Sequence, residues 1–168
     1  MRKLRALSIA GLAVLISAGA AVMPAQSHHS FAMFDDSKVY VFTGVVVRIN
    51  PDANHLQIYF APLNEERKTV LRDSAGKPIV WAVEMAGSAE VAREGVTVNT
   101  FKPGTIMSVG LHPLRSSQPA GDRQGGLFRC PENTPPAPGA HCDSVEGHVL
   151  HGEGALPEPT EPAPAQGG

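Results

Sequence analysis

The segment that most restricts how this chain folds is residues 39–49, VYVFTGVVVRI. All but two of its residues are β-branched or aromatic, a composition typical of β-strands. Gly44 interrupts the run, and a glycine inside a strand indicates a bulge or a sharp bend. We therefore expect a long, bent strand here, at the centre of a mainly β fold.

Other parts of the chain carry weaker strand patterns. Apolar and polar residues alternate in HLQIYFA and in PIVWAVEM, as in strands with one buried face. The polar residues 50–54 and 115–126 are rich in turn formers and are expected to be loops. Four further segments are expected to be strands: residues 55–61, 78–85, 106–112 and 127–130.

One segment has helical character. Residues 88–94 begin with Ser88, a residue favoured at helix N-caps, and are followed by Gly95, a typical helix stop. The expected order is three strands, one short helix and two strands, which is the order of the OB-fold, a small five-stranded Greek-key barrel. We therefore predict an all-β, OB-like barrel with one short helix, with a β-sandwich as the alternative.

The N-terminal residues 1–27 resemble a secretory signal peptide. Three cations precede a long apolar run: Arg2, Lys3 and Arg5. Ala25 and Ser27 occupy positions −3 and −1 of a signal peptidase site if cleavage falls before His28. We expect a periplasmic or secreted protein without a stable membrane anchor after cleavage.

The mature chain is expected to contain one small domain with extensions. We assign residues 28–38 to an N-terminal leader and residues 39–130 to the barrel. Residues 131–152 form a proline-rich extension, and residues 153–168 an acidic tail that we expect to be disordered.

The two cysteines, Cys130 and Cys142, are twelve positions apart. In an oxidising compartment such an isolated pair is most simply a disulfide, which would close the proline-rich extension. A metal–thiolate pair is the alternative, but the spacing matches no zinc pattern.

The charge distribution argues against nucleic acid as a partner. Removal of residues 1–27 changes the net charge from −2 to −5. Within residues 28–142, the positive and negative charges cancel to a net charge of zero. A nucleic-acid binder needs a basic face to neutralise phosphates, and this composition does not supply one.

Several short motifs occur in an order that resembles a known family: HHSFAMFD, TGVVVRINP followed by a histidine, WAVEM and TFKPG. The chain resembles the domain of unknown function 6152 family, small exported bacterial proteins, over about residues 28–130. The resemblance implies export and a compact β fold, but no activity. The family pattern has a histidine directly after Asn-Pro, whereas Asp-Ala-Asn separates Pro51 from His55 here.

Cleavage before His28 would leave an α-amine and an imidazole on one residue. These two nitrogens can chelate copper(II), with a third nitrogen from His29, His55 or His112. Cleavage after Ala25 would place His28 third, where copper(II) binds through the amine and two amide nitrogens. Three methionines add sulfurs that suit copper(I): Met33, Met85 and Met107. The alternative is an exposed leader anchored by Phe31 and Phe34, with Met85 and Met107 filling the core.

Motifs of common enzyme classes, such as G-x-S-x-G, H-E-x-x-H and C-x-x-C, are missing from the sequence. The primary hypothesis is therefore an exported, non-catalytic binding module for an unknown protein, peptide or small-molecule ligand. The second is a periplasmic copper-binding or copper-handling protein with His28 as the principal ligand. Three further histidines fall in the extension and are expected to bind metal weakly at most: His141, His148 and His151.

Overall fold

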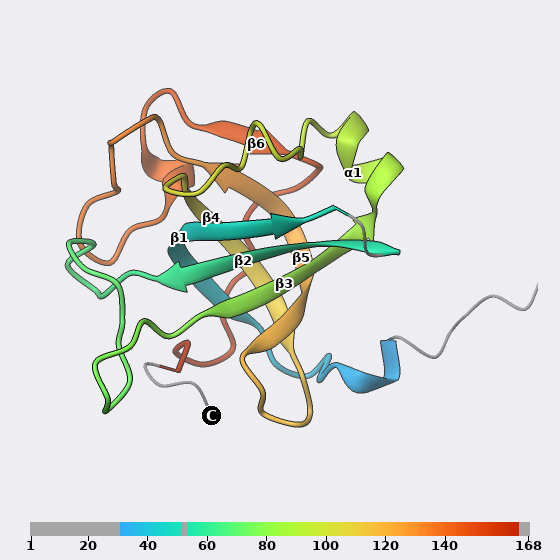
Figure 1. Cartoon of the computed structure of the whole chain (residues 1–168), viewed down its shortest axis with the longest axis horizontal. Coiled ribbons are helices and arrows are strands. Elements are labelled where there is room, and N and C mark those ends of the chain that lie inside the picture. Colours follow the sequence, from blue (N-terminus) through green and yellow to red (C-terminus); the bar gives the residue numbers. More distant parts are fainter. Residues whose placement is uncertain (1–30, 52–53, 165–168) are drawn as a thin grey trace, which may run out of the picture.

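The computed structural model describes residues 31–51 and 54–164, and five long strands dominate it (Figure 1). These strands are β1 (Tyr40–Asn50), β2 (His55–Pro62), β3 (Trp81–Gly87), β4 (Ile106–Pro113) and β5 (Ala120–Arg129). The short elements are η1 (Phe31–Met33), α1 (Ser88–Arg93), η2 (Cys142–Ser144) and β6 (Val149–His151).

The strands close into a barrel. Antiparallel pairs join them in the order β3-β2-β1-β4-β5, and a short parallel pairing of β3 with β5 completes the circle. The helix α1 lies between β3 and β4 in sequence. This arrangement confirms the predicted OB-like five-stranded barrel with one short helix, and not the alternative β-sandwich.

Of the bulge or sharp bend expected at Gly44, the bulge lies elsewhere. The β1–β2 register shifts between Val46 and Arg48, while Gly44 itself pairs regularly with both neighbouring strands. A Cβ at Gly44 would lie 2.6 Å from Cδ2 of Phe60 and 2.8 Å from the carbonyl oxygen of Ala61. The glycine therefore permits the close approach of β2 to β1.

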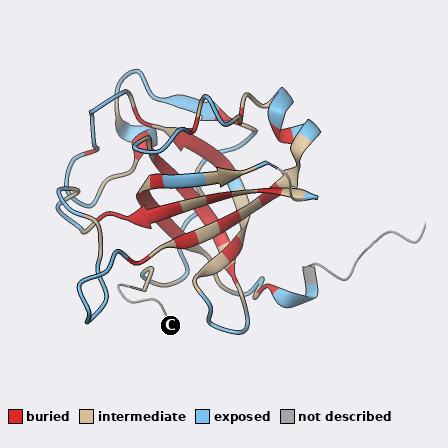
Figure 2. Ribbon diagram, in the orientation of Figure 1, coloured by how far each residue is buried: buried red, intermediate tan, exposed pale blue. Residues whose placement is uncertain are grey.

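Many residues of the barrel strands are buried (Figure 2), and their inward-facing side chains fill the barrel interior. The alternating residues of β2 and β3 point inward, and Val91 of α1 packs into the same core. The largest fully buried residues include Phe60, Phe101, Ile58, Met107, Leu111 and Leu127. A core this full leaves the outer surface and the rims as the places where a ligand can bind.

The fifth strand is longer than predicted. We expected a loop over residues 115–126 and a strand over 127–130, but β5 spans Ala120–Arg129. The polar and glycine-rich first half of β5 pairs with β4 on one side and with β3 on the other. Barrel closure satisfies its backbone groups, so tertiary pairing overrides its weak local strand pattern.

The residues after β5 lie against the barrel. Cys130 and Cys142 form the predicted disulfide, with their Cα atoms 4.9 Å apart. The strand β6, which we did not predict, pairs with β5 through Leu127 and His151. Residues 153–164 were expected to be disordered. They contain no helix or strand, but Thr160 hydrogen-bonds to Val39 and Ala163 packs against the core.

Within the described ranges, no helix is both long and apolar enough to cross a bilayer.

Candidate functional site

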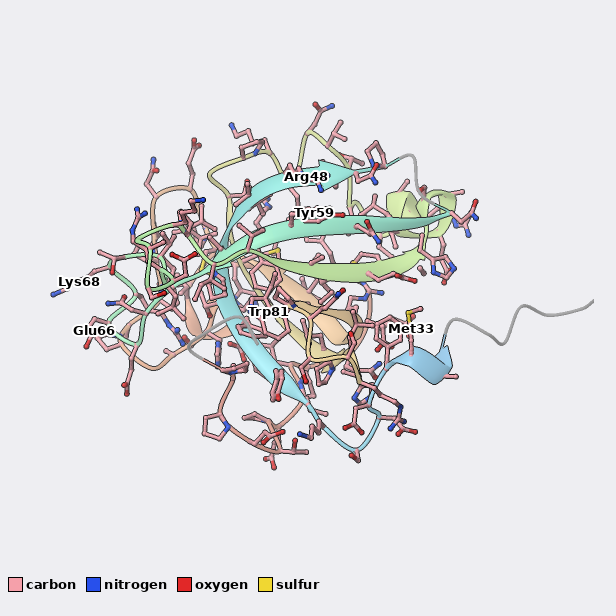
Figure 3. The ribbon with its side chains drawn as sticks, turned by 60° about the horizontal axis from the view of Figure 1, so that its bottom comes forward. Met33, Arg48, Tyr59, Glu66, Lys68 and Trp81 are labelled. Atoms are coloured by element: carbon pink, nitrogen blue, oxygen red, sulfur yellow. A yellow bond between two sulfur atoms is a disulfide. The ribbon has the colours of Figure 1, made fainter. Side chains whose placement is uncertain are left out.

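The leader runs directly into the barrel. His28 and His29 lie outside the described residues, and the described chain begins at η1, whose Met33 is exposed (Figure 3). Phe34 is buried and forms a β-bridge with Leu114 just after β4. The Asp35 N–H donates to the carbonyl oxygen of Pro113 at 2.8 Å. Phe34 therefore anchors the leader, as predicted; the side chain of Phe31 lies outside the description.

Four titratable residues form a row across the outer surface of four adjacent strands. We call His55 (β2), Glu84 (β3), Asp122 (β5) and His112 (β4) the acid–imidazole row. Glu84 is the register partner of Asp122, and Asp122 is the partner of His112. The residues on either side of Glu84 and the residue before His112 are buried in the core, so the row faces outward.

The first contact of the row joins His55 to Glu84. Nδ1 of His55 lies 2.6 Å from Oε1 of Glu84. Because a carboxylate only accepts hydrogen bonds, Nδ1 carries the proton and Nε2 of a neutral imidazole keeps its lone pair. Glu84 thereby orients the ring, an arrangement that also occurs around metal-binding histidines.

His112 is oriented in the same way by the backbone. Its Nδ1–H donates to the carbonyl oxygen of Lys38, 2.6 Å away, at the end of the leader. A carbonyl oxygen cannot donate, so Nε2 of a neutral His112 also keeps its lone pair. The leader and β4 together therefore hold this imidazole in place.

Asp122 is the most perturbed member of the row. Burial raises the pKa of its carboxyl group, and the nearby His112 partly offsets that rise. Oδ2 accepts a hydrogen bond from Nε2 of Gln124 at 3.0 Å. Oδ1 is inaccessible to solvent and has no hydrogen-bond partner among the described residues. A buried carboxylate oxygen without a donor is costly to ionise, which agrees with the raised pKa of this group.

A surface pocket of about 340 Å³ adjoins the row. Three members of the row line this pocket: His55, Glu84 and Asp122. Glu90 and Phe34 also line it. Phe34 is the anchor of the leader, so the pocket lies where the described end of the leader, residues 31–33, joins the barrel. The site therefore combines carboxylates, an imidazole and an aromatic wall.

The described histidines among the predicted metal ligands, His55 and His112, lie at opposite ends of the acid–imidazole row. Among the residues that the structure describes, no group of three His, Cys, Asp or Glu side chains is placed to hold a metal ion. Met85 and Met107 are buried in the core, which agrees with the alternative that they are core filler. A metal site on this surface would need ligands from outside the described ranges.

Sequence reasoning missed two features of the site. Asp122 fell in a segment expected to be a loop, and only the weak alternation of AGDRQ could have indicated it. His141 fell in the proline-rich extension, yet its Nδ1 lies 2.8 Å from Oγ1 of Thr43. Thr43 in turn contacts Ser108 at 2.7 Å, and Ser108 accepts the backbone N–H of Cys142 at 2.8 Å.

This second cluster joins the extension to the barrel. Thr43 and Ser108 are fully buried, so neither hydroxyl is open to a substrate. Burial lowers the pKa of His141, and the neighbouring Arg67 lowers it further. The cluster therefore holds a neutral histidine against β1 and β4, which is a structural role.

A cation–π contact lies on the outer surface of β1 and β2. The guanidinium carbon of Arg48 lies 3.4 Å from the ring centroid of Tyr59 on the adjacent strand (Figure 3). This cation–π contact lies on β1 and β2, and neither residue lines the pocket. It provides no obvious opening for a ligand.

Comparison with known proteins gives one match. A family model described as "Family of unknown function (DUF6152)" matches residues 14–124. No curated protein and no solved structure matches the chain.

Proposed function

This chain belongs to the DUF6152 family, and we propose that it is an exported, non-catalytic binding module that holds a small cationic ligand beside the acid–imidazole row. The observation that carries the proposal is the set of carboxylates that Glu84, Glu90 and Asp122 contribute to the pocket lining. A cationic ligand would be attracted to these groups.

The charges around the pocket favour a cation. Glu84, Glu90 and Asp122 contribute carboxylates to the lining. Arg123 also lines the pocket, but its guanidinium is paired with Glu94 through contacts of 2.7 and 3.2 Å. The carboxylates thus outnumber the free positive groups, and Phe34 adds an apolar wall for the body of the ligand.

Two observations support export. Residues 1–27 have the pattern of a signal peptide, and the disulfide is compatible with an oxidising compartment. The absence of enzyme motifs supports a non-catalytic role.

The first experiment is the intact mass of protein purified from the periplasm, under native conditions and after denaturation. The denatured mass identifies the N-terminus. We expect a native adduct of a small organic cation that Asp122→Asn abolishes and Glu158→Gln, at an exposed position outside the pocket, retains. A native mass equal to the denatured mass, before and after incubation with periplasmic extract, would refute the proposal.

A copper site is the second candidate, and the orientation of two histidines favours it. His55 and His112 each direct Nδ1 at an oxygen and keep Nε2 available. Two residues separate His28 from η1, whose C-terminal neighbour Phe34 lines the pocket. Cleavage before His28 would supply an amine and an imidazole as the further nitrogens of the set.

The same mass measurement, repeated after addition of copper(II), separates the two candidates. The copper proposal predicts one retained copper that is lost in His28→Ala and in His112→Ala but kept in His148→Ala. His148 is an exposed histidine of the extension and serves as the matched control. Copper retention unaffected by His28→Ala would contradict this second proposal.

A further inference from the structure

The C-terminal residues 154–164, which we call the strap, cross the outside of the barrel from β5 over β4 to β1. In Figure 1 this red segment leaves β6 and runs behind the strands to the opposite edge. The Gly126 N–H donates to the carbonyl oxygen of Ala155 at 3.2 Å, and Pro157 lies over Gly110 of β4. Thr160 accepts a hydrogen bond from the backbone N–H of Val39, the residue before β1.

Glycines form the floor beneath the strap. A Cβ on Gly110 would lie 2.3 Å from Cγ of Pro157, and one on Gly125 would lie 2.4 Å from the carbonyl oxygen of Ala155. A Cβ on Gly126 would similarly lie 2.4 Å from the carbonyl oxygen of Gly154. Three side chains are thus missing along one track, which lets the strap lie directly against the backbone of β4 and β5.

Specific polar contacts hold the strap at β1. The Val39 N–H donates to Oγ1 of Thr160 at 2.9 Å, and the Thr160 N–H donates to the carbonyl oxygen of Val39 at 3.1 Å. Glu161 places Oε1 3.2 Å from Nζ of Lys38, and this contact raises the pKa of Lys38. These contacts lie at the two residues before β1, and residues 154–164 form no strand there, so the strap is held through the side chains of a threonine and an acid.

Apolar contacts complete the docking. Ala163 packs against the core, and Pro164 lines a cavity of about 260 Å³ together with Tyr40 and Trp81. Nε1 of Trp81 is buried and has no hydrogen-bond partner among the described residues. Aromatic side chains beside an extended, proline-rich segment are the usual means by which proteins recognise such segments.

We propose that the surface beneath the strap is a docking site for an extended, proline-rich segment of an exported partner protein, and that the strap occupies this site in the free protein. The partner segment carries prolines around a Thr-Glu pair, because these are the groups that the glycine track, Val39 and Lys38 contact. The strap is tethered, so its effective concentration is in the millimolar range and a partner must displace it.

The test uses the full chain with a protease-cleavage sequence inserted between the exposed residues Glu153 and Gly154, cleaved only after folding. A fluorescent peptide of residues 154–168 is then titrated against cleaved and washed protein by anisotropy. We expect it to bind the cleaved protein at least tenfold more tightly than the uncleaved chain. A peptide with Thr160→Ala and Glu161→Gln should bind at least fivefold more weakly, and Glu158→Gln should leave binding unchanged.

The receptor side provides a second readout. Gly110→Ala should weaken peptide binding at least fivefold, because its Cβ takes the place of the Pro157 ring, whereas Gly87→Ala should leave it unchanged. Asp122→Asn should also leave it unchanged, so that failure of the pocket proposal and failure of this one are distinguishable.

Three results would overturn the inference. The first is absence of peptide binding by cleaved, folded protein. The second is equal binding of a scrambled peptide of the same composition. The third is a dimeric uncleaved chain in light scattering that becomes monomeric on cleavage, which would assign the site to the strap of a second copy.

Discussion

Individual residues of this protein owe their roles to their neighbours across the sheet. His55 and His112 have the same side chain, but a carboxylate orients one and a backbone carbonyl orients the other. Asp122 lies between Glu84 and His112 and is partly cut off from water, so its carboxylate lacks part of its solvation. A residue in this position is suited to binding a ligand and is poorly suited to stabilising the fold.

The substitution Asp122→Asn tests this view. The pKa of Asp122 is raised in the folded state, so the stability of the wild-type protein falls as pH rises through that pKa and the carboxyl group ionises. Asn does not ionise. We therefore expect the free energy of unfolding of the variant, relative to the wild type, to increase between pH 4 and pH 7 in urea titrations. A constant difference across that range would contradict the assignment of the raised pKa.

Gly121 permits the close approach of β5 to β4, which barrel closure requires. A Cβ on Gly121 would lie 2.3 Å from the carbonyl oxygen of His112 and 2.6 Å from Cδ1 of Leu111. Because the first neighbour is backbone, β4 and β5 must separate to admit it. We expect Gly121→Ala to reduce the free energy of unfolding by about 1–3 kcal/mol.

The matched control is Gly87→Ala, whose Cβ has its nearest neighbour at 3.8 Å, the carbonyl oxygen of Asn54. Gly87 is the N-cap of α1, where Ala is less favourable than Gly, so this substitution should cost about 1 kcal/mol or less. Equal effects of the two substitutions in chemical denaturation would contradict the close-approach explanation.

At the scale of elements, the extension after β5 behaves as part of the barrel. The disulfide, Phe128 and the partly buried Val145 form a second small cluster beside the main core. His141 hydrogen-bonds to Thr43 of β1, and His151 of β6 donates Nδ1–H to the carbonyl oxygen of Glu94 at 2.9 Å. Burial lowers the pKa of both imidazoles, so both are held in the neutral form.

This docking should weaken in acid. A histidine with a lowered pKa in the folded state contributes stability that is complete above the unfolded value of about 6.5 and is lost as pH falls through the folded pKa. We expect the free energy of unfolding to fall between pH 7.5 and pH 5. In His141→Gln the fall should be smaller, because one of the two neutral histidines is gone.

The same variant should be less stable at pH 7.5 by about 1 kcal/mol, since the hydrogen bond to Thr43 is lost or weakened. Urea titrations at pH 7.5, 6 and 5 measure both effects. His148→Gln, at an exposed position, is the control and should follow the wild-type pH dependence. An unchanged pH dependence in His141→Gln would show that His141 does not contribute to acid sensitivity.

At the scale of the whole molecule, a small barrel is wrapped by the residues that follow β5, about a quarter of the sequence. The chain leaves β5 at Cys130, returns to β5 as β6 and then crosses β5, β4 and β1 as the strap. One face therefore carries the acid–imidazole row and the adjoining track carries the strap. The two proposed binding surfaces are neighbours on β4, where Gly110 and His112 are two positions apart.

The disulfide limits how far this wrapping can loosen. It links cysteines 12 positions apart, and closing a loop of that length contributes roughly 3 kcal/mol in the chain-entropy model. We expect the double variant Cys130→Ala/Cys142→Ala to lose about that much free energy of unfolding in urea. The wild type in reducing agent should show a similar loss, and a loss below about 1 kcal/mol in both would contradict this role.

The local sequence was sufficient to predict the fold class, the disulfide and the short helix. In strongly β-branched or alternating segments, such as residues 39–49 and 55–61, the local pattern predicts a strand with a buried face, because one face of each strand must pack against a core. A pair of cysteines and a helix between Ser88 and Gly95 are also local signals. None of these depends on which strands become neighbours.

Only the tertiary structure decided the features that depend on pairing. The first half of β5 is polar and rich in glycine, and it became a strand because β3 and β4 supply hydrogen-bond partners on both sides. The same closure placed Asp122 between Glu84 and His112. It also aligned the glycines of β4 and β5 against which the strap packs. Contacts between residues distant in sequence produce no periodic pattern in the sequence. The acid–imidazole row and the strap site therefore form only when the barrel closes.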